Sequence, residues 1–470
     1  MNKPAGHSVN KAEDSIQQRL TSYACGLNYD ALPPEAIHAA KVRVIDTFGA
    51  LIAGFFGEPC RIARELAAEM PNPNGATVIG TRMKTSLDMA AFANATAARY
   101  AELNDAYQTA GTSRGHPSDY LTPVLGVAER AQVNGRDFVT SVVLAYEVFV
   151  TFSEILHNHR GFDHTTCGCL CTAVSAGKVM GLSPSQLSHC ISMAVVPNVI
   201  LRQVRTSYLS MFKAAAAGQA SRGGVFAAML ARAGMEGPHL PFEGKAGWCD
   251  HVNGKRFSLG TMGGNGIPFR ILETGIKNRP CNAKALTSVL AAEKAALALK
   301  SFNDVKHVTV EIHKNAMDSV GSGDHAWNPT SREDADHSVP YLVAATLMEG
   351  TVTLHSFNDA HLWNPDLRAL MKKIEVIEND EFTKAYWKLP QQHRSRVTVV
   401  TRSGEQLVGE AGGDQDDLAA PKTDARIEQK FRGLTEDVFD AKRVNAILDR
   451  LWHLEELGNV AEIPPAFVLG

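Results

Sequence analysis

Hydrophobic residues recur at three- and four-residue spacing through most of the first 265 or so residues, a pattern that predicts helices. In Pro34–Gly54 a proline stands in the first helical turn. In Ser183-Pro184-Ser185-Gln186 a capping serine precedes proline and glutamine, as at a helix start. No alternating strand pattern competes here. The predicted helices are Ser15–Leu27, Pro34–Gly54, Met89–Leu103, Thr122–Gln132, Gly135–Leu156, Thr172–Met180, Ser183–Ala194 and Met211–Ala233.

The pattern changes after about residue 270. Val305–His313 alternates with period two, as a half-buried strand does, and Lys373–Ile377 repeats this on a shorter scale. Arg396–Val408 is typical of a hairpin that turns at Ser403-Gly404. Because helical patterns separate these strands, the segment is predicted to be α+β. The helices between the strands are predicted at Ala283–Leu299, Val339–Gly350 and Pro365–Lys373.

Helical spacing returns over Thr423–Leu457, after the Gly- and Asp-rich segment Gly409–Asp417. A chain of 470 residues also exceeds the roughly 250–300 residues that one core supports. We therefore predict a mainly α fold with an α+β insertion. Both chain ends, residues 1–269 and 416–470, form a large all-helical domain, and residues 270–415 form a smaller α+β lid domain that interrupts it.

Composition excludes several classes of protein. Hydrophobic residues make up 44% and charged residues 21%, close to the average for soluble globular proteins. With 47 Lys and Arg against 50 Asp and Glu, no basic excess points to nucleic acid or an anionic membrane. Met1–Glu13 has no apolar core, and no apolar stretch reaches the ~20 residues that span a bilayer. Eight sparse cysteines indicate a reducing compartment, so we expect a cytoplasmic location.

Two loops carry ionisable residues among Gly, Pro and Ser. The first contains Asp105, Arg114 and His116, and the second contains His164 next to an aspartate. Histidine titrates near neutral pH and can act as an acid or a base. The alternative is that both loops are ordinary helix ends, capped by Ser118 or by a threonine after His164.

Two further segments lead into helices. Arg202, Arg205 and Lys213 precede a run of small apolar residues, where cations suit carboxylates. The segment Pro329–Tyr341 carries charges and a histidine. Here the alternatives are cations that extend to solvent and a capped helix start.

Other motifs are missing. The sequence has no G-x-G-x-x-G, P-loop, H-E-x-x-H or G-x-S-x-G pattern. Cys167, Cys169 and Cys171 have alternate spacing, unlike the C-x₂-C pairs of zinc sites, and are interpreted as small packing residues on a helix. We therefore expect no metal site.

Taken in order, the ionisable segments resemble the MmgE/PrpD family, whose type activity is 2-methylcitrate dehydratase. The resemblance covers nearly the whole chain. It implies a helical domain built from both chain ends, a smaller α+β lid, a homodimer, and catalysis without a metal or an organic cofactor. The segments that carry it are Asn104-Asp105 with Gly115–Asp119, Gly161–Thr166, Met211–Val225 with Phe242-Glu243-Gly244, Ile276–Cys281 and Ala335–Ala344.

Carried over by this resemblance, the catalytic positions are Asp105, His116, His164, Lys213 and Tyr341. One position departs from the family: after the Pro-Cys piece, members usually have a histidine, and this chain has Lys284 nearby. Lysine keeps a positive charge but does not exchange protons at neutral pH as histidine does. The residues expected to bind carboxylates are Arg114, Arg202, Arg205 and Lys284.

The leading hypothesis is a cofactor-independent hydro-lyase that removes water from a citrate-like tricarboxylate. Lys213 either binds a carboxylate or donates a proton, and the roles of the two histidines stay open. On the same fold, cis-aconitate decarboxylation or epimerisation of a dicarboxylate are alternatives. Outside this class, a non-catalytic helical assembly protein and a metal-dependent enzyme remain as hypotheses.

Overall fold

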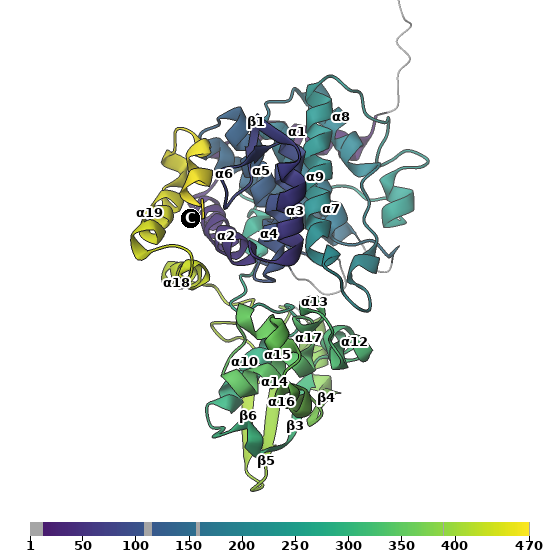
Figure 1. Ribbon diagram of the computed structural model, residues 1–470. Coiled ribbons are helices and arrows are strands. Elements are labelled where there is room, and N and C mark those ends of the chain that lie inside the picture. The colour runs from purple at the N-terminus through teal and green to yellow at the C-terminus, as the bar shows by residue number, and fades with distance from the viewer. Residues whose placement is uncertain (1–12, 108–114, 157–159, 389, 470) are drawn as a thin grey trace, which may run out of the picture.

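The computed structural model describes residues 13–107, 115–156, 160–388 and 390–469. It is mainly helical with a small mixed sheet, arranged in a large and a small lobe (Figure 1). In the described residues two large clusters of buried side chains form separate cores, accompanied by two small clusters. The core of the large lobe draws on residues 16–276 and 427–467. The core of the small lobe draws on residues 281–418, with Ala106 added. A domain boundary near residues 270 and 415 remains our proposal.

Helices build the large lobe. The bounds of α2 agree with the prediction, and the predicted Ser183–Gln186 start is a capping box. Two predictions were incomplete: α7 begins seven residues before the predicted Thr172, and α3 was not predicted. The helices are α1 (Ser15–Gly26), α2 (Pro34–Gly54), α3 (Glu58–Ala68), α4 (Leu87–Tyr100), α5 (Leu121–Ala131), α6 (Gly135–Ile155), α7 (Thr165–Val179), α8 (Pro184–Val195), α9 (Phe212–Arg232), α18 (Asp424–Thr435), α19 (Ala441–Trp452) and α20 (Ile463–Ala466).

Small residues let α4, α7 and α9 pack closely. A Cβ added at Gly218 of α9 would lie 2.7 Å from the carbonyl oxygen of Phe92 in α4. A Cβ at Gly224 would lie 2.6 Å from the carbonyl oxygen of Cys169 in α7. Both distances are too short for carbon against backbone oxygen. Glycine therefore sets the spacing of the helices that carry the candidate site, and the cysteines of α7 are buried packing residues, as predicted.

The expectation of no strands in the first part was wrong. A small antiparallel pair, β1 (Pro71–Thr77) and β2 (Lys84–Thr85), follows α3. The segment Pro71-Asn-Pro-Asn-Gly has low strand propensity and no period-two pattern, so sequence alone gave no signal. Tertiary contacts hold it instead: Glu129 of α5 accepts hydrogen bonds from the amide and hydroxyl of Thr77.

The small lobe contains a four-stranded sheet in the order β4-β3-β5-β6. β3 (Val305–Ile312) and β4 (Ile374–Glu378) are parallel, and the other neighbours, β5 (Ser395–Thr401) and β6 (Gln406–Ala411), are antiparallel. The predicted strands and the turn at Gly404, whose φ is +90°, are confirmed. The helices are α10 (Leu286–Ala296), α11 (Lys314–Ala316), α12 (Asp324–Trp327), α13 (Arg332–Ala335), α14 (Val339–Glu349), α15 (Asp359–Leu362), α16 (Pro365–Met371) and α17 (Asp380–Trp387).

The C-terminal helices pack against α2 in the large lobe. Figure 1 shows the yellow helices α18 and α19 beside the purple α2. The rings of Phe48 in α2 and Phe467 lie with centroids 4.7 Å apart, and Phe431 of α18 packs on Gly49. Among the described residues α6 is long and apolar enough to cross a membrane, but 83% of its apolar window is buried inside the protein, as in a core helix.

Candidate active site

Two histidines face each other in the large lobe. His116 precedes the short helix η2 (Pro117–Tyr120), and His164 is the N-cap residue of α7. Their ring centroids are 5.6 Å apart, edge to face. Nδ1 of His116 lies 2.6 Å from the carbonyl oxygen of Asp105, which can only accept a hydrogen bond. The neutral ring of His116 therefore carries its proton on Nδ1 and keeps a lone pair on Nε2.

Burial keeps both rings neutral. Burial and the nearby Arg99 and Lys277 hold the pKa of His116 well below its usual value. Burial lowers the pKa of His164 to about 3, although the neighbouring Asp163 acts in the other direction. At neutral pH both histidines are therefore proton acceptors rather than cations.

An ion pair flanks His164. Nε of Arg205, in the short helix η4 (Arg202–Arg205), donates to Oδ2 of Asp163 at 3.0 Å. Burial raises the pKa of Asp163, but Arg205, His164 and the hydrogen bonds from Thr165 together outweigh it and bring the pKa to about 2. Nη1 and Nη2 of Arg205, like Nε2 of His164, are buried and have no hydrogen-bond partner in the described part of the chain. The guanidinium donors of Arg205 are costly to leave unpaired and fit an anionic ligand.

Gly115 leaves room for the pair of histidines, His116 and His164. A Cβ at Gly115 would lie 2.4 Å from Cδ2 of His164 and 2.7 Å from the ring of Phe149. The glycine before His116 therefore allows the ring of His164 to pack against the backbone. Asp105 contacts the residues that follow His116: its Oδ1 accepts a hydrogen bond from the amide of Ser118 at 3.2 Å.

A second group of charges centres on Lys213, at the start of α9. Its Nζ donates to Oδ1 and Oδ2 of Asp336 at 2.7 and 2.9 Å, and Nδ1 of His337 is 3.5 Å away. Nδ1 of His337 also lies 2.5 Å from Oδ1 of Asp336. Lys213 belongs to the large lobe, and Asp336 and His337 follow α13 in the small lobe. Both lobes therefore build this cluster.

Glu102 joins the two groups. Its carboxylate lies 2.9 Å from Nζ of Lys277, 2.7 Å from Nη1 of Arg99 and 3.5 Å from Nζ of Lys213. Burial raises the pKa of Glu102, but these cations outweigh it and hold the pKa well below its usual value. The backbone of Glu102 has a φ of +55°, which a residue with a side chain seldom adopts. Arg99 also lies 3.6 Å from Asp119, next to His116.

Positive charge exceeds negative charge in this cluster. Burial raises the pKa of Asp119 to about 8 despite Arg99, so this carboxyl is largely neutral at pH 7. Burial raises the pKa of Asp336, but Lys213 and His337 bring it below its usual value. Within the described residues, four cations thus surround two carboxylates, Glu102 and Asp336. The cations are Arg99, Lys213, Lys277 and Arg332.

Glu102, Asp336 and His337 also place three possible metal-ligand atoms within 4.8 Å of one another. A metal ion does not fit this set well, because each carboxylate already contacts lysine and arginine cations. Another cation there would meet Lys213 at the same oxygens. The donor set suits an anion held by the cations better than a metal held by the carboxylates.

The remaining predicted residues lie elsewhere. Tyr341 is buried in the core of the small lobe, where its hydroxyl donates to the carbonyl oxygen of Ser356 at 2.5 Å. Nζ of Lys284 donates to Oγ of Ser319 at 3.0 Å in the same lobe. Arg202 is exposed, and Arg114 lies outside the described residues. The structure thus brings together Asp105, His116, His164 and Arg205, and Lys213 is linked to them through Glu102, Arg99 and Asp119.

Sequence reasoning missed Arg99 and Glu102. Both stand in the predicted helix Met89–Leu103, whose neighbours are almost all alanine or other apolar residues. Charges on so apolar a helix have to be paired when they are buried, and that was the available signal. Lys277, Asp336 and His337 lie in the segments that resemble the family, but the sequence predicted no role for them.

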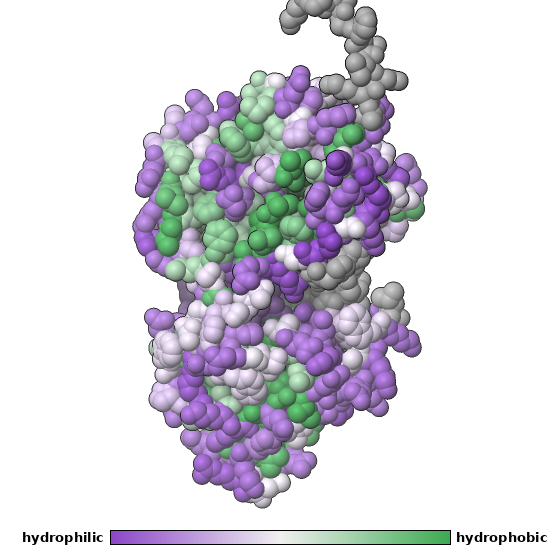
Figure 2. All heavy atoms as spheres, turned by 90° about the vertical axis from the view of Figure 1, so that its right-hand side faces the viewer, coloured by the Kyte–Doolittle hydropathy of each residue, from purple (hydrophilic) through white to green (hydrophobic). Residues whose placement is uncertain are grey.

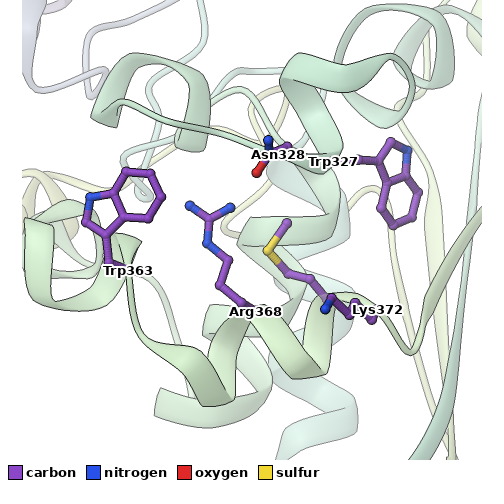
Figure 3. A pocket seen from close by; sticks show the side chains of 6 residues that line it. Trp327, Asn328, Trp363, Arg368 and Lys372 are labelled. Carbon is purple, nitrogen blue, oxygen red and sulfur yellow. The ribbon is translucent and has the colours of Figure 1, made fainter.

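Two hollows lie near these residues or on the small lobe, and Arg332 of the charged cluster borders the larger one. A cavity of about 940 Å³ between the lobes is bordered by Ile52, Tyr100, Arg332, Phe357 and Leu434, among others. A hollow of about 340 Å³ on the small lobe is shown in Figure 3, where Arg368 extends toward the ring of Trp363. None of the predicted site residues borders either one.

The large lobe thus holds two neutral histidines, which can exchange protons, and the junction of the lobes holds a buried excess of cations, which can hold an anion. Models of the MmgE/PrpD N-terminal domain and the MmgE/PrpD C-terminal domain match residues 18–259 and 280–454. The chain belongs to the MmgE/PrpD family, as the sequence resemblance indicated.

Named relatives cover most of the chain. A probable 2-methylcitrate dehydratase of Saccharomyces cerevisiae is 28% identical over 75% of this chain and 72% of its own length. The 2-methylcitrate dehydratase of Salmonella typhi is 26% identical over 77% of each chain. The cis-aconitate decarboxylase-like protein oryM of Aspergillus oryzae is 22% identical over 96% of this chain and 97% of its own.

Proposed function

We propose that this protein is a hydro-lyase that removes water from a citrate-like tricarboxylate without a metal or an organic cofactor. The observation that carries the proposal is the buried excess of positive charge around Glu102 and Asp336. A substrate with several carboxylates would neutralise it, and the unpaired Nη1 and Nη2 of Arg205 would hold one carboxylate. The dehydratase names of several family members support the same reaction class.

Dehydration needs a base at carbon and an acid at the leaving hydroxyl. In our proposal Nε2 of His116 takes the proton next to a carboxylate, and the C–H electron pair forms the C=C bond. The C–O bond breaks, and the hydroxyl takes a proton from Nζ of Lys213 and leaves as water. Asp105 fixes the tautomer of His116 through its carbonyl oxygen, and His164 packs against the ring.

The roles of three predicted residues are weaker in this proposal. Tyr341 has its hydroxyl engaged by Ser356, and Arg202 is exposed, so we assign neither to the reacting atoms. Lys284 stays a proposed carboxylate ligand that enters when the small lobe moves toward the substrate.

A second candidate is decarboxylation of cis-aconitate, favoured by the nearly full-length match to the decarboxylase-like protein of Aspergillus oryzae. Both reactions build negative charge next to a carboxylate. The test is purified protein with 2-methylcitrate, citrate, isocitrate and cis-aconitate. Growth of alkene absorbance in the ultraviolet supports dehydration, and carbon dioxide release supports decarboxylation. No turnover of any of the four contradicts both.

We further propose a homodimer in the cytoplasm. Large apolar side chains are exposed on and just after α3, and on α9 and the segment before it, where a partner would cover them. Figure 2 shows green apolar areas on the large lobe. They are Ile62, Leu66, Met70, Leu201, Met211, Phe212 and Phe226.

A further inference from the structure

Lys213 is cut off from solvent. Its side chain is 1% exposed, and its Nζ contacts Asp336 and Glu102. In the proposed reaction this amine loses one proton in every turnover. Both carboxylates have pKa values held below their usual range by cations, so neither stores a proton for it at neutral pH. A further group has to return the proton.

His337 has the required position. Its Nδ1 lies 3.5 Å from Nζ of Lys213, and both touch Oδ1 of Asp336. Its side chain is 14% exposed, so the ring reaches from the buried amine toward solvent. The other cations of the cluster are Lys277, which is buried away from solvent, and Arg99 and Arg332. A guanidinium does not give up its proton in proteins.

We propose that His337 is a proton shuttle that reloads Lys213 from solvent, a role that rests on the proposed function. Nε2 of His337 takes a proton from solvent, and the proton on Nδ1 then passes to the neutral amine of Lys213. The ring returns to its first tautomer by exchange with solvent. The net change is one proton moved from solvent to Nζ, which balances the proton that His116 releases after each turnover.

Asp336 acts as the positioning residue. Its single carboxylate fixes the imidazole and the amine next to each other, so the transfer needs no rearrangement. Because Asp336 and His337 both come from the small lobe, the relay exists only while that lobe is seated on α9. This separates the shuttle from the His116 pair, which lies wholly in the large lobe.

The test is rapid mixing of enzyme with 2-methylcitrate, in wild type, His337→Ala and His337→Gln. We expect a first turnover at close to the wild-type rate, because Lys213 starts protonated, followed by a steady state at least 10-fold slower. Imidazole in the buffer should restore the steady state of His337→Ala and leave wild type unchanged. His361→Ala is the matched control, since His361 is also partly exposed and paired with a carboxylate, Glu349, 3.1 Å away.

Three outcomes overturn the shuttle. One is a His337→Ala steady state at the wild-type rate. Another is a first turnover slowed as much as the steady state with no response to imidazole, which indicates a direct or structural role. The Gln variant keeps this comparison available if His337→Ala does not fold. The third outcome is that wild type does not turn over 2-methylcitrate, citrate or isocitrate. In that case the proposed function is wrong, and the shuttle that rests on it is wrong as well.

Discussion

Nζ of Lys213 in the large lobe lies 2.7 Å from Oδ1 of Asp336 in the small lobe, and both side chains are buried. Removing one partner of a buried ion pair leaves the other charge unpaired and out of water, which strongly destabilises the folded protein. We expect Asp336→Asn to lower kcat at least 100-fold and to destabilise the protein by about 3–5 kcal/mol.

Steady-state kinetics with 2-methylcitrate and thermal unfolding measure both effects. Asp318→Asn is the control, because Asp318 forms an exposed pair with Lys314 and should change stability by less than about 1 kcal/mol. A kcat of Asp336→Asn equal to that of wild type would contradict the proposed role of Lys213 as the acid.

Arg205 and Arg202 offer a matched pair of cations. The Nη atoms of Arg205 are buried without a described partner, and Arg202 is exposed three residues away. A hydrogen bond to a charged group is worth about 1.5–3 kcal/mol, so Arg205→Gln should raise KM roughly 10- to 100-fold. Arg202→Gln should stay within about 2-fold of wild type. Equal effects of both substitutions on KM would contradict the assignment.

Stability should fall with acid because of His164. The pKa of this histidine is about 3 in the folded protein and 6.5 in its ordinary state. Between these values the unfolded chain binds the extra proton, so the stability that depends on a neutral His164 is complete above pH 6.5 and declines toward pH 3. Between pH 6.5 and 5 the loss is about 2 kcal/mol.

Urea unfolding of wild type and His164→Gln at pH 7 and pH 5 checks this. The Gln variant should lose less stability than wild type over the same interval. Identical losses in the two proteins would place the acid sensitivity on other residues.

Gly115→Ala should disturb the histidine pair. The new Cβ would lie 2.4 Å from Cδ2 of His164, so the ring has to move, at a cost of about 1–3 kcal/mol. We expect a 10-fold or larger loss of kcat together with a lower melting temperature. Gly433→Ala is the control, because a Cβ there meets nothing within 4 Å and alanine favours the helix. A fully active Gly115→Ala enzyme would show that His164 need not pack there.

The apolar face of α3 and α9 predicts self-association. Phe226 on α9 is 49% exposed, and Phe226→Glu places a charge in the proposed interface. Sedimentation velocity should show a dimer for wild type and a shift toward monomer for the variant. Leu297→Glu, on the small lobe, should leave the dimer intact. A wild-type monomer would contradict the homodimer directly.

The spacing of hydrophobic residues predicted much of the secondary structure. Helices such as α2 and the alternating strand β3 have one face buried in a single core, so their spacing follows from local rules. The pair β1–β2 was missed because a side chain of α5, Glu129, fixes it from another part of the chain. In the site, His116 and His164 were found from their loops. Arg99 and Glu102 were not, because their importance comes from Lys277 and Lys213, far away in sequence.

The contact between Phe48 and Phe467 has a consequence for how the protein is made. The core of the small lobe comes almost wholly from one continuous stretch, residues 281–418, whereas the large core needs residues on both sides of that stretch. During synthesis the small lobe can fold while α2 still waits for the helices that cover it. Completion of the large core therefore has to wait until residues 427–467 have been synthesised, and a chaperone that shields apolar surface would act on α2 until α18 arrives.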